Sequence, residues 1–187
     1  MQSKRRKRRR KKGALIILIL ILGILLAFLS YLILKDRNPS EAGIRHLEAG
    51  EYDLAIVQFN QAIDKEKNEA DAYRGLGISY YEKQEYNKAK EALLRSLKEG
   101  AKESATIYNI LAICEGEDQE AAIIYYQKGL KLVGNEKELE KEMLQNLTVL
   151  YEEKRDYANA RDYLARYVKL SPEDEDAKRE LAFLQTR

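Results

Sequence analysis

A nine-residue pattern occurs four times along this chain, and it constrains the fold more than any other feature. Its first copy is Ala55–Ile63, in which a small residue is followed four positions later by a large one and then by another small one. The copies begin at Ala55, Ala89, Ala122 and Ala160, at intervals of 34, 33 and 38 residues. Each copy follows a short helical pattern and a charged turn, which gives a repeating unit of two helices. This period predicts an array in which each helix pair buries its apolar stripe against the next.

Helix start and stop signals set the limits of these units. Asn38 followed by Pro39 is typical of a helix start, Gly100 of a helix C-terminus, and Ser104 of a further start. Ser171 before Pro172 predicts one last helix, whose polar outer face suits the end of an array. The expected repeats are 39–69, 70–103, 104–136 and 137–171, and the expected capping helix is 172–186.

The second repeat carries the most specific motif, with Tyr73, Leu76, Gly77, Tyr80, Tyr86, Ala89 and Leu93 in order. This order resembles the tetratricopeptide repeat, W-x2-L-G-x2-Y…A-x3-F…P. In the third repeat the alignment places Leu111 where Gly is usual and Cys114 where the aromatic residue is usual. The resemblance covers 39–187 and implies an all-α fold, an α-solenoid of about four helix pairs with a C-terminal capping helix.

Small residues at fixed positions are expected to let the helices of one repeat approach closely. Gly43 and Gly77 would do so from the first helices, and the four motif alanines from the second helices. Large side chains such as Phe59, Tyr80 and Tyr126 would fill the space between pairs.

The N-terminus combines a basic run with a long uncharged segment. All nine residues of 4–12 are basic: Lys4, Arg5, Arg6, Lys7, Arg8, Arg9, Arg10, Lys11 and Lys12. The formal net charge of the chain is +2, so subtracting these nine charges leaves −7 for the remainder. Gly13–Leu34 carries no charge, and 22 helical residues reach roughly 33 Å, enough to cross a bilayer core. We therefore expect a basic cytoplasmic tail (1–12), a transmembrane signal-anchor helix (13–35) and a short linker (36–38).

The charges on either side of this segment predict its orientation. Excess basic charge before the span favours a cytoplasmic N-terminus and extracytoplasmic repeats. The basic run would also attract anionic lipid. It has no interleaved aromatic residue, so we do not expect nucleic-acid binding. A cleaved signal peptide is the weaker alternative, because the apolar stretch is too long and no small-residue cleavage site follows it.

Few residues offer catalytic or metal chemistry. His46 is the single histidine and Cys114 the single cysteine, and the repeat register assigns both to packing positions. No phosphate loop or hydrolase motif occurs in the sequence. We therefore expect no enzyme activity, no cofactor, no metal ion and no small-molecule substrate.

The resemblance instead implies protein binding, because the first helices of tetratricopeptide repeats line a concave groove that takes peptides or helices. The residues transferred to this groove by register are Ile44, Leu47, Arg74, Ile78, Tyr81, Tyr108, Asn109, Ala112, Gln145, Asn146 and Val149. Glutamates flank them: Glu41, Glu48, Glu82, Glu115, Glu152 and Glu153. Ser40 and Ile44 occupy positions where a carboxylate-binding clamp would have Lys and Asn. An acidic groove of this kind favours a neutral, apolar or basic partner segment.

Together these features predict a bacterial single-pass membrane protein whose extracytoplasmic repeats act as an adaptor or scaffold. Envelope assembly, secretion or folding are the processes that the resemblance implies. Two alternatives remain at this stage: a self-associating structural scaffold, and a receptor of inverted topology whose repeats face the cytosol.

Overall fold

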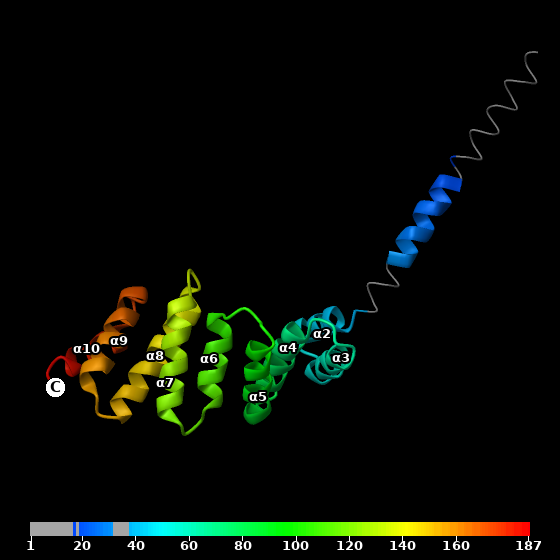
Figure 1. Cartoon of the computed structure of the whole chain (residues 1–187). Coiled ribbons are helices and arrows are strands. Elements are labelled where there is room, and N and C mark those ends of the chain that lie inside the picture. The colour runs from blue at the N-terminus through cyan, green and yellow to red at the C-terminus, as the bar shows by residue number, and fades with distance from the viewer. Residues whose placement is uncertain (1–16, 18, 32–37) are drawn as a thin grey trace, which may run out of the picture.

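The computed structural model describes residues 17, 19–31 and 38–187, and every regular element in these ranges is an α-helix (Figure 1). The helices of the repeat region are α2 (Pro39–Glu48), α3 (Tyr52–Asp64), α4 (Glu69–Glu82), α5 (Tyr86–Lys98), α6 (Ala105–Cys114), α7 (Gln119–Leu132), α8 (Lys137–Glu153), α9 (Tyr157–Leu170) and α10 (Glu175–Leu184).

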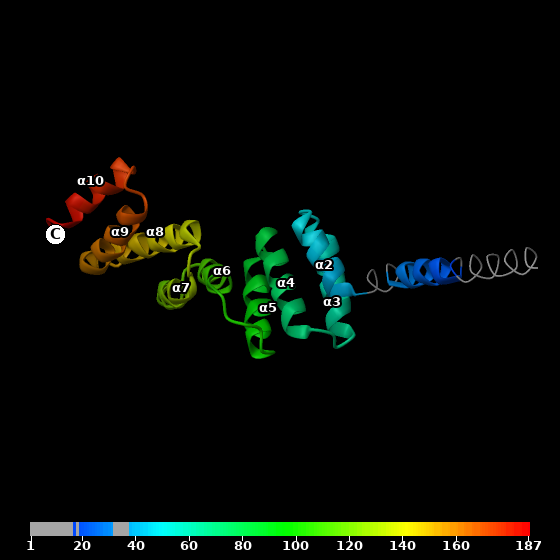
Figure 2. The ribbon, with the colours of Figure 1, turned by 90° about the horizontal axis from the view of Figure 1, so that it is seen from above.

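These helices form four antiparallel pairs that follow one another along an elongated molecule (Figures 1 and 2). The pairs are α2–α3, α4–α5, α6–α7 and α8–α9, and α10 packs on α9 at the C-terminal end. The expected solenoid of four pairs with a capping helix is confirmed. The chain is therefore built as a one-dimensional array, in which each pair packs mainly on its sequence neighbours.

The N-terminal helix consists of residue 17 and residues 19–31, and Figures 1 and 2 show it clear of the repeat helices. Its large apolar side chains are between 51% and 70% exposed. Within the described ranges no helix has both the length and the apolar character needed to cross a membrane. The predicted basic tail, and residues 13–16, 18 and 32–37 of the predicted span and linker, lie outside the described residues.

Phe59 shows why small residues recur in this array. Its ring is fully buried between α2 and α4. A Cβ added to Gly43 would lie 2.6 Å from the ring, and one added to Gly75 would lie 2.2 Å from it. Gly77 makes a similar approach to Leu93, at 2.6 Å. The close approach at Gly43 and Gly77 is confirmed, whereas the inter-repeat contact at Gly75 was not anticipated.

Several helix ends follow the expected capping chemistry. The Ser104 hydroxyl accepts a hydrogen bond from Ile107 N at 3.3 Å, and Gly100 follows α5 with a φ of +92°. The last helix differs from the prediction. It begins at Glu175, because the Asp174 side chain, and not Ser171, accepts from Ala177 N at 3.0 Å.

The third repeat has a different register from the one inferred from sequence. Tyr108 is only 4% exposed, and Lys128 Nζ of α7 lies 5.4 Å from its ring centroid. Arg95 of α5 lies over Tyr73 in the same way, at 5.7 Å. Tyr108 therefore takes the position of Tyr73, 35 residues earlier, and the first-helix motif of this repeat is Tyr108, Leu111 and Ala112.

This shift corrects the assignments made with the earlier alignment. Leu111 occupies the usual Leu position and packs with Ala89 and Leu93. Ala112 is the small residue that packs against α7, in one cluster with Ala122. The placement of Leu111 at the Gly position was therefore an error of one residue in the alignment.

Candidate functional site

The first helices of the repeats form a continuous surface, because α2 contacts α4, α4 contacts α6, and α6 contacts α8. Residues spaced three or four positions apart on these helices share this side of the array. Ile44 of α2 is 43% exposed and Val149 of α8 is 51% exposed. Gln145 is also exposed, and the half-buried members are Leu47, Arg74, Ile78, Tyr81 and Asn146. We call this set the first-helix surface.

A polar cluster occupies the middle of the first-helix surface. Asn109 Nδ2 of α6 donates to Glu142 Oε1 of α8 at 3.0 Å, and the Asn109 side chain is almost completely buried. Among the described residues, Asn109 Oδ1 has no hydrogen-bond partner. A buried acceptor without a donor is uncommon in proteins. Asn109 is held by its hydrogen bond to Glu142, whose side chain is the exposed member of this pair.

Two tyrosines border this cluster. Burial, followed by the negative charges of Glu142 and Glu82, raises the pKa of Tyr81. Burial also raises the pKa of Tyr126, with a further contribution from Glu142. Both phenols therefore stay neutral around pH 7. Tyr126 is buried in the core, whereas the half-buried Tyr81 can act as a hydrogen-bonding group on the first-helix surface.

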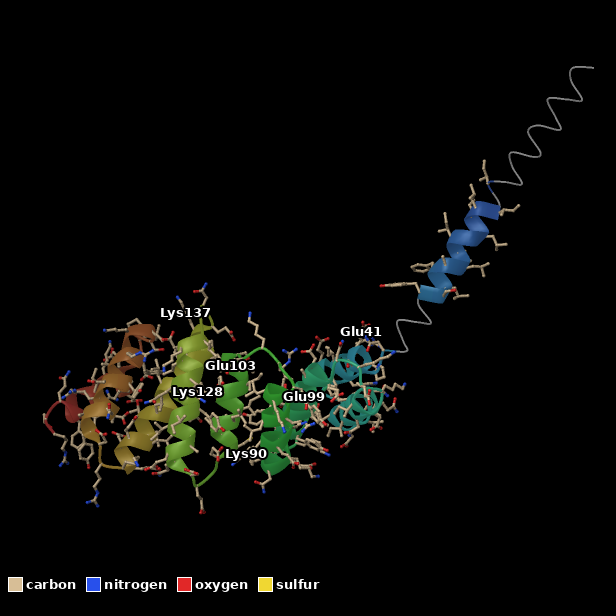
Figure 3. All side chains as sticks on the ribbon, in the orientation of Figure 1. Glu41, Lys90, Glu99, Glu103, Lys128 and Lys137 are labelled. Carbon is tan, nitrogen blue, oxygen red and sulfur yellow. The ribbon has the colours of Figure 1, made fainter. Side chains whose placement is uncertain are left out.

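Three residues assigned to this surface from sequence lie elsewhere. Tyr108 stacks on Tyr125 of α7, with ring centroids 6.0 Å apart, and its hydroxyl donates to Glu103 at 2.8 Å. Lys128 also lies over the Tyr108 ring, and Figure 3 labels Glu103 and Lys128. Ala112 is buried against α7. The Glu115 side chain is 5% exposed and pairs with Lys90 of α5 at 2.6 Å, and Lys90 is labelled in Figure 3.

Sequence reasoning also missed two residues of the surface. Ile113 takes the position of Ile78 once the register is corrected, and it is half-buried. Glu142 is exposed and holds Asn109. The order Tyr108-x2-Leu111-Ala112 was the signal that could have found Ile113.

The C-terminal end of the first-helix surface is hollow and acidic. A cavity of about 250 Å³ opens between α8, α9 and α10. Val149 and Leu164 line it together with Asp174, Asp176 and Glu180. Burial raises the pKa of the neighbouring Glu152, and the charge of Glu180 and a hydrogen bond to it raise that pKa further. An incoming cation would relieve this repulsion between carboxylates.

The single histidine and the single cysteine have structural surroundings. Cys114 is buried, and this burial raises the pKa of its thiol to about 11, so the reactive thiolate is scarce near neutral pH. His46 Nδ1 lies 2.6 Å from Glu51 Oε2 across the turn that joins α2 to α3. His46 is half-buried, so it belongs less to the core than the sequence suggested. Within the described part of the chain, no three His, Cys, Asp or Glu residues are arranged to hold a metal ion.

Comparison with protein families agrees with this fold. Two sequence models, both of the tetratricopeptide repeat, match residues 46–114 and 142–174, which together make up more than half of the chain. The architecture defines an α-solenoid protein. Within that class, the chain belongs to the tetratricopeptide repeat family.

Solved structures with the same architecture are similar over most of the chain. MamA from AMB-1 has 21% sequence identity and a TM-score of 0.65, and the match covers 78% of each chain. YrrB, described as a tetratricopeptide protein with an unusual peptide-binding site, has 21% identity and a TM-score of 0.66 over 79% of this chain and 77% of its own. The C-terminal part of a repeat protein from Cytophaga hutchinsonii has 22% identity and a TM-score of 0.62 over 81% and 64%. At these identities the likeness shows the fold alone. A search of curated protein sequences gives no match.

Proposed function

We propose that this chain is a membrane-anchored adaptor that binds a peptide or helix of a partner protein on its first-helix surface. The observation that carries this proposal is the series of exposed or half-buried apolar side chains from Ile44 to Val149, beside the hydrogen-bonded pair of Asn109 and Glu142. Exposed apolar groups beside a few fixed polar atoms are typical of peptide-binding surfaces.

The charges on this surface indicate which charge the partner segment should carry. Glu48, Glu82 and Glu142 are exposed along it, and Arg74 is held by Asp71 at 2.9 Å. The acidic cavity beside Val149 lies at its C-terminal end. An apolar segment with at least one Lys or Arg toward the α8–α10 end fits this arrangement, because an acidic segment would meet like charges.

The N-terminal helix supports the membrane part of the proposal. Its large apolar side chains, Ile17 and those between Ile19 and Tyr31, are all exposed in the structure, and lipid would remove them from water. The nine basic residues before it favour a cytoplasmic N-terminus and extracytoplasmic repeats. An adaptor held in this way would serve envelope assembly, secretion or folding.

Site-specific crosslinking tests the binding surface. A photoreactive residue at Tyr81 or Val149 of the full chain in cells should capture the same partner protein. The matched control is Ile124 of α7, which is 52% exposed but belongs to a second helix. Capture from Ile124 alone would contradict the assignment of the surface. Capture of a second copy of this chain from Tyr81 and Val149 would support the self-associating scaffold instead.

A further inference from the structure

A cavity of the repeat array lies away from the first-helix surface. It has a volume of about 660 Å³ and runs along α4 and α5. Tyr73, Leu76 and Tyr80 line it from α4. These residues follow helical spacing on one face of α4, whereas Arg74, Ile78 and Tyr81 follow it on another face. The cavity, which we call the α4–α5 groove, is thus separate from the surface already proposed.

The groove is open because the second repeat lacks a side chain that later repeats possess. Ala92, three residues after the motif alanine of α5, lines the groove. The corresponding residue is Tyr125 in α7 and Tyr163 in α9. Tyr125 stacks on Tyr108 with centroids 6.0 Å apart, and Tyr163 stacks on Tyr151 at 5.5 Å. The second repeat has Tyr73 and Tyr80 on α4 but no ring on α5 that packs over them. The empty space over Ala92 therefore suits one aromatic side chain, and we call it the aromatic vacancy.

Cations surround this aromatic vacancy. Lys88 Nζ lies 5.2 Å from the centroid of the Tyr80 ring, and Arg95 Cζ lies 5.7 Å from that of Tyr73. Lys98 also lines the groove, and Glu91 is the one acidic residue among its lining residues. Lys88 and Arg95 pair with Glu85 and Glu99 at 2.6 and 2.8 Å. Exposed pairs of this kind contribute only about 0.2–1 kcal/mol, so an incoming carboxylate can replace them.

We propose that the α4–α5 groove is a second docking site, which binds an acidic segment of a partner protein through one aromatic side chain. The ring packs over Ala92 against Tyr73 and Tyr80, where Tyr125 and Tyr163 lie in the later repeats. Carboxylates beside that ring pair with Lys88, Arg95 and Lys98. The charge preference is opposite to that of the first-helix surface, so the array can hold two unlike segments at once.

A peptide-binding measurement on the full chain in detergent micelles tests this site. The probe is a fluorescein-labelled peptide with a central Phe and three Asp or Glu residues on each side, followed by fluorescence anisotropy. Two comparison peptides carry Ala for Phe, or Lys and Arg for the acidic residues. The acidic Phe peptide should bind at least about tenfold more tightly than either comparison peptide.

Two variants locate the bound peptide. Ala92→Tyr fills the groove with the ring that α7 and α9 already contain, and it should weaken binding by about tenfold or more. Lys98→Glu should weaken binding to a similar extent. Its control is Lys131→Glu, which reverses an exposed charge at the corresponding position of α7 and should leave the affinity unchanged. Tyr81→Ala, on the first-helix surface, should also leave it unchanged.

Three results would overturn the proposal. One is an acidic Phe peptide that binds no better than its Ala or basic counterparts. Another is unchanged affinity in both Ala92→Tyr and Lys98→Glu, with the helical circular dichroism of the parent retained. The third is displacement of the peptide by phosphatidylglycerol added to the micelles but not by phosphatidylcholine, with phosphatidylglycerol binding lost in Lys98→Glu, which would assign the groove to an anionic membrane surface.

Discussion

At the scale of single residues, the array depends on the volume available around a few buried rings. Phe59 occupies the space that a Cβ would need at Gly43 and at Gly75. Such contacts cannot relax easily, because the Phe59 ring is enclosed by α2, α3 and α4. Glycine is a poor helix former, so its presence in the middle of α4 reflects this packing and not a backbone preference.

Gly75→Ala should therefore destabilise the protein although alanine favours the helix by about 1 kcal/mol. The added methyl group would overlap the Phe59 ring, and overpacking typically costs about 1–3 kcal/mol. Urea unfolding would measure the loss. Gly129→Ala is the control, because its new Cβ would meet the flexible Met143 Sδ at 2.6 Å and should cost less. Adding Phe59→Leu to Gly75→Ala should recover part of the loss, and strictly additive effects would contradict the contact.

Substitution of Tyr108 and of Tyr81 should distinguish a residue that packs the core from one that binds the partner. Tyr108 is buried against α7, so Tyr108→Ala should lower the free energy of unfolding by about 3–5 kcal/mol. Tyr81 is half-buried on the first-helix surface, and Tyr81→Ala should cost only about 1–2 kcal/mol while reducing partner capture. Equal destabilisation in both variants would contradict the corrected register of α6.

At the scale of helices, the second helices α3, α5, α7 and α9 could be predicted from sequence because each carries the same Ala-centred pattern. The motif alanines are 0% exposed in α3, α5 and α9 and 4% in α7. The register of α6 could not be predicted from this period. Its motif starts 35 residues after that of α4, whereas Ala122 follows Ala89 by only 33. The connection before α6 is longer than the one before α4, and α6 itself is shorter, with 10 residues against 14 in α4. These two differences offset each other, so the spacing of the second helices conceals the shift.

The same shift explains which of the residues assigned to the groove are accessible. Ile44, Ile78 and Val149 lie in the other three repeats, and they are exposed or half-buried. Tyr108 and Ala112 lie in the displaced helix and turn inward. Contacts between distant segments, such as Asn109 with Glu142, required the structure because local patterns carry no information on them.

The contact between α8 and α10 should make stability depend on pH. Burial and the proximity of Glu180 raise the pKa of Glu152 above its value in the unfolded chain. A raised carboxyl pKa favours folding below the unfolded pKa of about 4.3, and this contribution is lost as pH rises through the folded pKa. Glu152→Gln should therefore be more stable than the parent at pH 7, by less than about 1 kcal/mol because the group is largely solvated.

Thermal unfolding at pH 7 and at pH 3.5 measures this effect. The advantage of Glu152→Gln should shrink at pH 3.5, where the Glu152 carboxyl of the parent is protonated. Glu173→Gln removes an exposed carboxylate outside this pair and serves as the control. An advantage that grows on acidification would contradict the proposed repulsion between Glu152 and Glu180.

At the scale of the whole molecule, charge is divided between the two ends of the chain. The nine basic residues of 4–12 precede the apolar segment, and the rest of the chain carries a formal net charge of −7. The repeats themselves present an acidic first-helix surface and a basic α4–α5 groove on different faces of α4. A protein anchored at one end would expose both faces to partners near the membrane.

Protease accessibility tests the proposed anchor and its orientation. With one tag before Met1 and another after Arg187, proteinase added to spheroplasts should remove the C-terminal tag and spare the N-terminal one, because basic residues before a span keep their side cytoplasmic. Replacing all nine basic residues of 4–12 by Gln should allow both orientations, so that part of the C-terminal tag becomes protected. Extraction by sodium carbonate should leave the parent chain in the membrane fraction. Protection of the C-terminal tag in the parent would support the cytosol-facing alternative, and release by carbonate would contradict the anchor itself.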